Sequence, residues 1–383
     1  MGQSATLDSA AMLDPALRDD LVALSRAIHE DPELAYEEHR AVERIAELLE
    51  RRGHAVERGL GGLATAFRAR VGPPGPAVAL LAEYDALPDV GHGCGHNLIA
   101  MTNVGAFLAA TKDSAGLEVA IELVGTPAEE SGGGKIQLLE AGAFADVVAV
   151  LSSHPSTGAD WGVGRGTLGV AKRRVVYHGL AAHAAASPER GRNALNAVIL
   201  LFVGVDAWRQ RLRGDARVHG IVTKGGVAYN IVPSLAEALF GLRAARVEDL
   251  DEMLRTFEDI ARGAALQTGT TVESYEEMPL HAPTRTHPAL TKLLHAELER
   301  RGVKVDVGKL VSASTDLGNV SQVVPTEAVS FPVSEVPIAG HSHVMREATV
   351  TELAHRNAFI TTEALAAVAR RVATDAEVRR ALG

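Results

Sequence analysis

The sequence predicts an α/β protein, in which a larger domain with a central, mostly parallel sheet contains an inserted, smaller α+β domain. Between Ala77 and Leu151, short apolar runs bounded by Pro or Gly alternate with helical patterns, as in a sheet covered by helices on both faces. Near Gly166 the pattern changes to alternating strands and long helices, and after Pro283 the first pattern returns. A chain of 383 residues is long enough for two or three domains.

The N-terminal part of the larger domain is predicted from apolar spacing. Apolar residues at helical intervals indicate two helices between Leu17 and Arg52, separated near Asp31 and Pro32. Three apolar runs then predict strands that are buried on both faces. These runs are 77–82, 117–124 and 147–151.

The inserted domain is predicted from a β-α-β-α order. A half-buried strand (171–177), a helix from Pro188 to about Leu212, a strand (235–242) and a helix (247–266) follow one another. We therefore assign residues 169–282 to the smaller domain, and residues 1–168 and 283–383 to the larger one. The C-terminal part of the larger domain is expected to hold a helix (287–301), a strand (328–333) and a helix from Thr351.

The composition excludes several classes of protein. Hydrophobic residues make up 46% and charged residues 22%, which is typical of an ordered globular chain. The 38 basic and 48 acidic residues give a net charge of -10, and no basic run contains interleaved aromatics, so we expect no nucleic-acid partner. The longest strongly apolar stretch, 194–205, is far shorter than the roughly 20 residues that span a bilayer, so we expect no membrane insertion.

The expected compartment is the cytoplasm. Residues 1–20 include acidic side chains and do not resemble a secretory signal. The single cysteine, Cys94, excludes an intramolecular disulfide and fits a reducing environment.

Side chains that bind metals follow each of the three predicted strands. Open α/β sheets place their sites at the carboxyl ends of strands. The mixture of carboxylate, thiol and imidazole groups suits zinc or manganese better than magnesium or calcium. The sequence therefore predicts a metal site at this edge. The groups are Glu83 and Asp85 with Cys94 and His96 after the first strand, Glu129 and Glu130 after the second, and His154 after the third.

Each of these residues alone has an ordinary explanation. A lone cysteine is most often a small buried hydrophobe, and a Glu-Glu pair is usually solvated. The histidines on both sides of Cys94, in a glycine-rich loop, favour the ligand interpretation. If one of Glu129 and Glu130 binds a metal, the other can handle protons.

Several longer motifs resemble one known family. The chain is similar to the dinuclear-metal peptidases and aminoacylases, in particular to the branch of auxin-conjugate amidohydrolases, aminobenzoyl-glutamate hydrolases and β-alanyl-lysine dipeptidases. The resemblance implies a metal-dependent hydrolase that cleaves the amide bond of an N-acyl amino acid, an aminobenzoyl-glutamate-like conjugate or a dipeptide. It covers about residues 20 to 365. The motifs, in order, are HEDPELAYEE (29–38), EYDALP, GCGHN, GTPAEE, SSHP, GLAAHAA, GGVAYNIVP, ASTDLGNVS and GHSH (340–343).

The resemblance also implies roles in the larger domain, which would be the metal-binding catalytic domain. Glu129 would be the general base, and Asp85 would orient a metal ligand. Two divalent ions, Zn or Mn, would be bound by five side chains, of which the fifth is His341 or, as an alternative, His343. These ligands are Cys94, His96, Glu130, His154 and His341.

In the smaller domain, the resemblance implies a lid and a homodimer contact. His183 would reach across the dimer to the substrate carbonyl, while Asn230 and Arg243 would bind the substrate's polar or carboxylate end. The ordinary alternatives are a surface histidine for His183 and a solvent-facing charge for Arg243.

The chain departs from the family pattern at two places. Glu83 stands where many relatives have aspartate or histidine. Thr315 replaces an acidic residue of the auxin-conjugate enzymes, so that Ser314-Thr315-Asp316 is more similar to the aminobenzoyl-glutamate and dipeptidase branch.

Two other functions remain open from the sequence. A thiol hydrolase would use Cys94 as nucleophile and His92 or His96 as base, but it leaves Glu129, Glu130 and His154 without roles. A catalytically silent metal- or peptide-binding protein on the same fold is the second alternative. A binding protein does not need a base such as Glu129 beside Glu130.

Overall fold

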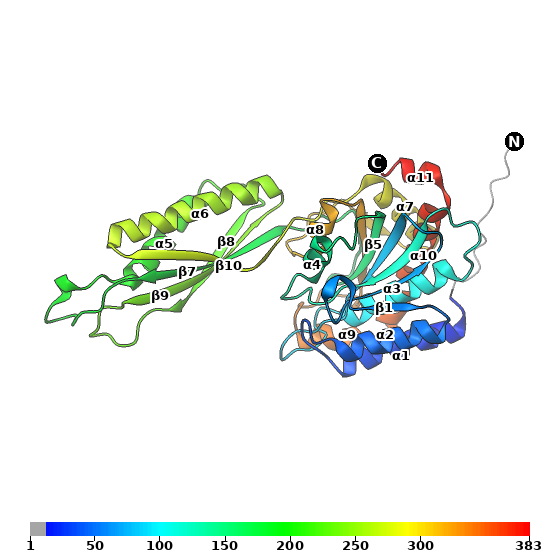
Figure 1. The fold of residues 1–383 in the computed structure, drawn as a ribbon, viewed down its shortest axis with the longest axis horizontal. Coiled ribbons are helices and arrows are strands. Elements are labelled where there is room, and N and C mark those ends of the chain that lie inside the picture. Colours follow the sequence, from blue (N-terminus) through cyan, green and yellow to red (C-terminus); the bar gives the residue numbers. More distant parts are fainter. Residues whose placement is uncertain (1–12) are drawn as a thin grey trace. The chain divides into compact units, whose positions relative to one another are not determined.

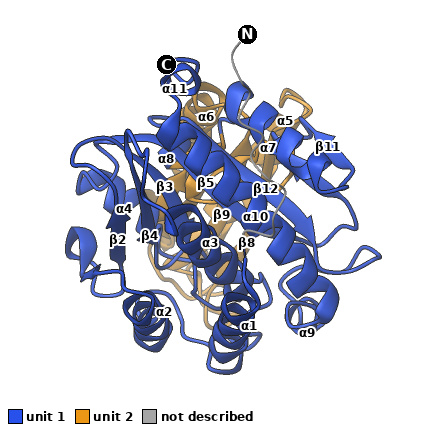
Figure 2. Cartoon of the chain, turned by 90° about the vertical axis from the view of Figure 1, so that its right-hand side faces the viewer, with its two compact units in different colours: residues 1–165, 285–309, 320–383 blue, residues 166–284, 310–319 orange. Residues whose placement is uncertain are grey.

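The computed structural model describes residues 13–383, which form two compact units (Figure 2). Unit 1 contains the chain up to Arg165 together with 285–309 and 320–383. Unit 2 contains 166–284 and 310–319. The predicted α/β class, with a smaller α+β part inserted into a larger one, is confirmed.

Unit 1 is built on an eight-stranded sheet in the order β1-β2-β4-β3-β5-β12-β6-β11. The four central strands, β4, β3, β5 and β12, are parallel to one another, whereas β2 is antiparallel to β4. Strand β3 is buried along its whole length, as a strand covered on both faces must be. The bounds are β1 (Val56–Arg58), β2 (Phe67–Val71), β3 (Ala77–Ala82), β4 (Ala120–Gly125), β5 (Val147–Ser156), β6 (Trp161–Val163), β11 (Val305–Val307) and β12 (Thr326–Pro332).

Helix α3 (His96–Thr111) packs against the sheet of unit 1 (Figure 1), and its residues are all buried. Helices α1 (Pro15–Glu30) and α10 (Glu352–Thr374) both contact it. Helix α1 begins where it does because the carboxylate of Asp14 accepts from the Leu17 N–H and Pro15 needs no hydrogen-bond acceptor. The other helices are α2 (His39–Arg51), α4 (Gly134–Glu140), α7 (Pro288–Arg300), α9 (His343–Ala348) and α11 (Ala376–Arg380), with η1 (Leu60–Gly62) and, at the junction of the units, α8 (Leu317–Ser321).

Unit 2 is an antiparallel sheet of four strands in the order β10-β7-β9-β8, covered by α5 and α6. Along β9, buried and half-buried residues alternate strictly, because one face of the sheet packs on the two helices. The bounds are β7 (Gly169–His178), η2 (Pro188–Arg190), α5 (Ala194–Arg209), β8 (Arg217–Lys224), β9 (Leu235–Ala244), α6 (Val247–Thr268) and β10 (Thr271–His281).

Three local expectations differ from the structure. Helix α5 begins at Ala194 rather than Pro188, because the Asn193 side chain caps it by accepting from the Leu195 and Asn196 N–H groups. The third strand continues to Ser156, since β5 keeps pairing with β12 beyond Leu151. Residues 310–319, assigned to the larger domain, belong to unit 2, where the Val311 N–H donates to the Gly166 carbonyl at 2.8 Å.

Across residues 13–383, the helices are all too short or too polar to cross a membrane.

Candidate metal centre

The parallel strands bring the predicted ligand groups to one edge of the sheet. β3 lies between β4 and β5 in parallel register, so the residues at their carboxyl ends converge. Glu83 and Asp85 follow β3, and Glu129 and Glu130 follow β4. His154 was expected to follow its strand but lies inside β5, paired in register with Ser330 of β12.

The Cys94 loop reaches this edge because of a glycine at the start of α3. Gly95 has φ 89°, a left-handed conformation that favours glycine. A Cβ atom there would lie 2.8 Å from Cγ of Pro155, so a larger residue would push the loop away from β5. Gly95 therefore lets Cys94 and His96 approach His154.

Among residues 13–383, three sets of three side chains lie close enough to share a cation. Within each set, the candidate ligand atoms lie within 4.8 Å of one another. Cys94 and His96 each belong to two of the sets. The sets are Cys94, His96 and His154; Cys94, Glu130 and His341; and Glu83, His96 and Glu129.

His341 rather than His343 joins the cluster. His341 Nε2 lies 3.7 Å from Glu130 Oε2, whereas His343 belongs to none of the sets that the described part of the chain contains. The backbone of His341 has φ 51°, and its N–H donates to the Gly93 carbonyl at 3.0 Å. Of the two histidines, the structure therefore brings His341 next to the other candidate ligands.

Hydrogen bonds aim the Nε2 atoms of two histidines into the cluster. His96 Nδ1 lies 2.9 Å from Asp85 Oδ1, and His154 Nδ1 lies 2.7 Å from the Pro155 carbonyl. When each Nδ1–H donates to its oxygen, the opposite Nε2 carries a lone pair for a metal. The other oxygen of Asp85 accepts from the Glu130 N–H at 3.0 Å, so Asp85 orients two of the candidate ligands.

Buried polar atoms without hydrogen-bond partners mark the centre of the cluster. Among the residues that the structure describes, they include Glu83 Oε2, His96 Nε2 and Glu130 Oε1. Leaving such atoms unsatisfied costs about 1–3 kcal/mol each, and more when they are charged. A divalent cation would satisfy all three, so this donor set fits a metal.

The electrostatics of the cluster are those of a site that needs a cation. Burial raises the pKa of the Cys94 thiol, so a thiolate requires a nearby positive charge. Burial opposes a charge on His96, but the carboxylate of Asp85 raises the pKa of His96 well above its usual range.

His92 is unsuited to serve as the base of a thiol hydrolase. It is buried, and burial lowers its pKa to about 3. A side chain with so low a pKa is a weak proton acceptor near neutral pH. Together with the raised pKa of Cys94, this leaves the thiol-hydrolase alternative unsupported.

Two charged residues of the site were missed by the sequence analysis. Lys135 is fully buried in α4, and its Nζ lies 2.9 Å from Glu83 Oε1. Burial alone would raise the pKa of Glu83, but the nearby Lys135 ammonium lowers it. Glu38, at the start of α2, is also buried and accepts from the Ala128 N–H. A lysine within the glycine-rich, apolar run GGGKIQLL was the available signal for Lys135.

In unit 2, the predicted substrate residues lie in two places. His183 is exposed in the loop after β7, where its Nδ1 accepts from the N–H groups of Ala185 and Ala186. The Asn230 carbonyl accepts from Ala184 at 3.0 Å, so His183 and Asn230 are neighbours. Arg243 is half-buried on β9, and its Nη1 donates to Ser314 Oγ at 2.7 Å.

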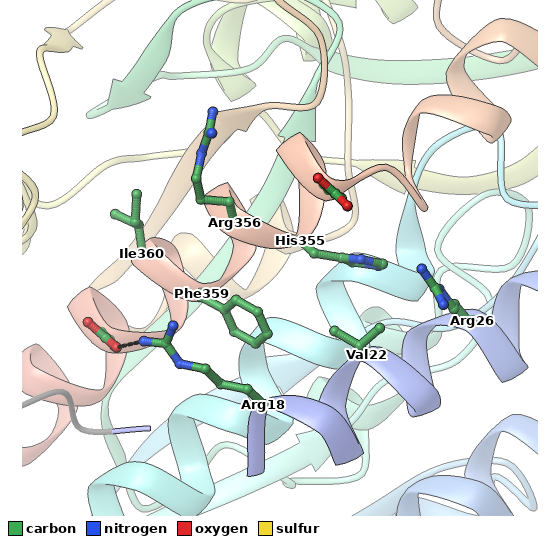
Figure 3. A pocket seen from close by; sticks show the side chains of 9 residues that line it. Arg18, Val22, Arg26, His355, Arg356, Phe359 and Ile360 are labelled. Carbon is green, nitrogen blue, oxygen red and sulfur yellow. Dashed lines mark hydrogen bonds and ion pairs between the residues drawn. The ribbon is translucent and has the colours of Figure 1, made fainter. Parts of the chain in front are cut away.

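A separate hollow of about 410 Å³ in unit 1 lies between α1 and α10 (Figure 3). On one wall, the guanidinium of Arg18 pairs with Glu363 at 3.0 Å. None of the ligand candidates lines it, so it is not where the chemistry of the cluster takes place. Its lining is Arg18, Val22, Arg26, Glu352, His355, Arg356, Phe359, Ile360 and Glu363.

Comparison with known proteins decides the family. The sequence pattern of the peptidase family M20/M25/M40 matches residues 79–371. The chain belongs to this family. The resemblance found in the sequence motifs is thereby confirmed, and the protein is a metal-dependent hydrolase of amide bonds.

Named relatives lie within the expected branch. The chain is 40% identical to mouse Xaa-Arg dipeptidase over 370 residues, which cover 91% of this chain and 84% of that protein. It is 37% identical to a p-aminobenzoyl-glutamate hydrolase chain of Escherichia coli K12 over 266 residues, 64% of this chain and 55% of that protein.

A solved structure shows the same fold. A dinuclear metal-binding M20 peptidase from Bacillus subtilis superposes with a TM-score of 0.71 at 20% identity. The superposition covers 91% of this chain and 98% of that one. At this identity the likeness supports the two-unit fold and not the site.

Proposed function

We propose that this M20 peptidase hydrolyses the amide bond of a dipeptide or N-acyl amino acid with two divalent ions, Zn or Mn. The observation that carries the proposal is the position of Cys94 in two ligand sets at once, with Glu129 beside them. The proposed ligands are Cys94, His96, Glu130, His154 and His341.

The charges of the cluster support two ions rather than one. With Cys94 as thiolate, the cluster and its neighbour Asp85 carry five negative charges, against one positive charge on Lys135. Two divalent ions balance the remaining charge, whereas a single ion would leave a buried excess that is costly in a low-dielectric interior.

The mechanism uses Glu129 as the proton carrier. Bound divalent ions acidify water and polarise the scissile carbonyl. Glu129, whose Oε2 lies 3.9 Å from His96 Nε2, accepts the proton of the attacking water and passes it to the leaving amine. Asp85 keeps His96 in the tautomer that presents Nε2 to the cluster.

We further propose that the substrate carries a free carboxylate, which Arg243 and Ser314 bind. Their 2.7 Å hydrogen bond holds the guanidinium in a fixed orientation on β9. The names of both relatives describe substrates with a free carboxylate: a dipeptide ending in Arg for one, and aminobenzoyl-glutamate for the other. Asn230 would contact the polar end of the same substrate.

His183 is proposed to stabilise the developing oxyanion in the site of a neighbouring protomer. The support for a homodimer is the exposed apolar surface of unit 2. Ile221 is 61% and Val222 48% exposed on the edge strand β8, and Val203 is 57% exposed on α5. An open, apolar sheet edge is a typical site for pairing with a second copy. The cytoplasm remains the expected compartment.

A substrate panel tests this function. Dipeptides with C-terminal Arg or Lys, N-acyl amino acids and aminobenzoyl-glutamate are incubated with the Zn- or Mn-loaded protein, and the released amine is measured. We expect cleavage of at least one class, its loss with a chelator and its return with added metal. If no amide is cleaved, or if a chelator has no effect on cleavage, the proposal is wrong.

A further inference from the structure

One carboxylate oxygen of Glu83 forms an ion pair, and the other has no hydrogen-bond partner among residues 13–383. Glu83 is 3% exposed at the end of β3, and its Oε1 binds Lys135 Nζ at 2.9 Å. Its Oε2 is buried without a hydrogen-bond partner in the described chain. This free oxygen lies 3.5 Å from His96 Nε2, which also has no hydrogen-bond partner there.

Lys135 is brought to Glu83 by an unusually close contact of α4. Gly134 begins the helix, and a Cβ atom there would lie 2.0 Å from the carbonyl oxygen of Pro127. Any other residue would therefore push α4 away from the loop that carries Glu129. The contact places the buried ammonium of Lys135 directly behind the carboxylate of Glu83.

A purely structural ion pair does not explain this arrangement. Buried ion pairs contribute little net stability unless their remaining lone pairs are also satisfied. Here Lys135 satisfies one oxygen, and the other faces His96 Nε2. With Nδ1–H given to Asp85, both facing atoms are lone-pair acceptors, which can face each other at this distance only through a proton or a metal cation between them.

We propose that Glu83 is itself a metal ligand, through Oε2, for an ion that His96 also binds, since these two side chains belong to one of the three sets. Lys135 is a positioning residue that turns Oε2 toward the ion by holding Oε1. The inference rests on the proposed metal centre and adds to it a sixth protein ligand. A carboxylate oxygen beside the imidazole nitrogen makes the ligand set of this ion harder and better suited to Mn²⁺.

Metal binding by the Glu83→Gln variant of the full chain tests the proposal. We expect this variant to lose one of two ions, or to bind it at least about tenfold more weakly, since even groups behind the ligands change affinity by about 10- to 100-fold. With Co²⁺, the thiolate charge-transfer band should persist because Cys94 remains, while the ligand-field bands change. Glu122→Gln is the matched control: Glu122 is equally buried, on β4, and pairs with Arg70 at 3.1 Å outside the cluster.

The double variant Glu83→Gln, Lys135→Met separates a lost ligand from a misfolded chain, because it leaves no unpaired charge behind. We expect it to fold and to show the same metal loss as Glu83→Gln. If either variant binds two ions with wild-type affinity and an unchanged Co²⁺ spectrum, Glu83 is not a ligand, although the proposed function stands. If the wild-type chain binds no metal, the proposed function itself fails.

Discussion

Glu38 Oε1 accepts a 2.8 Å hydrogen bond from the backbone N–H of Ala128, the residue directly before Glu129. Ala128 has φ 58°, a left-handed conformation that is costly for alanine. Glu38 comes from the start of α2 and is fully buried, and nearby Tyr36 donates to the Gly132 carbonyl at 2.7 Å. The N-terminal motif therefore holds the loop that aims Glu129.

Glu38→Ala should lower kcat by about tenfold or more with unchanged metal content, because small displacements of a catalytic group are costly. Glu38→Gln keeps an oxygen that can accept from Ala128 and should retain most of the activity. Glu37→Ala serves as a control, since the Glu37 side chain is 77% exposed. Steady-state kinetics and elemental analysis provide the readouts, and an unchanged kcat in Glu38→Ala would show that this hydrogen bond does not position the base.

Glu129→Gln should retain the metals and lose at least about two orders of magnitude in kcat, because it removes a proton carrier and not a ligand. Glu130→Gln should instead weaken metal retention, since its Oε2 and His341 Nε2 face each other at 3.7 Å. Metal content and single-turnover rates distinguish the two. Equal behaviour of the two variants would contradict the assignment of separate roles.

His183→Ala chains and Glu129→Gln chains, each inactive alone, should recover up to about half of wild-type activity when they form mixed dimers. One of the two composite sites is then intact, if His183 acts in the neighbouring protomer. Mixed dimers isolated with two different affinity tags provide the measurement. Absence of recovery in confirmed mixed dimers would mean that His183 serves its own chain or no catalytic purpose.

Glu327 should make stability depend on pH. Burial on β12 raises its pKa from 4.5 to about 7. Since the folded chain holds this proton more tightly than the unfolded chain, the contribution to stability is complete below about pH 4.5 and is lost as the pH rises through 7.

Glu327→Gln should remove this loss. Between pH 4.5 and 7.5, the unfolding free energy of the wild type should fall by about 3 kcal/mol more than that of the variant, given about 1.4 kcal/mol per pKa unit. Urea unfolding with a chelator in every sample keeps metal binding out of the comparison. Parallel pH curves for the two proteins would contradict the shifted pKa.

Elements with a strong apolar pattern were predictable from sequence. Strand β3 begins and ends at the predicted residues, because an uninterrupted apolar run between Pro76 and a glutamate leaves little choice. Strands β8 and β10 were not predicted, because most of their residues are exposed or half-exposed and carry no apolar alternation. Their pairing with β9 and β7 is a tertiary feature that local sequence does not encode.

The part of the site that lies at the ends of predicted strands could be predicted from the sequence. The residues after β3 and β4 were found because parallel strands gather their carboxyl ends at one edge. Glu38 and Lys135 were missed because most charged residues are exposed. The hydrogen-bond partner of Glu38 is Ala128, 90 residues further along the chain. Lys135 pairs with Glu83, which follows a different strand. Only the folded chain shows that these two charges are buried.

The metal content of the active protein tests the central claim most directly. The chain is purified without chelator, its metals are counted by elemental analysis, and amide hydrolysis is followed as a chelator removes them. We predict two divalent ions per chain, with activity lost as the ions are removed and regained when Zn²⁺ or Mn²⁺ is returned. Full activity in a chain that holds no metal would contradict the account and would make Cys94 the candidate nucleophile.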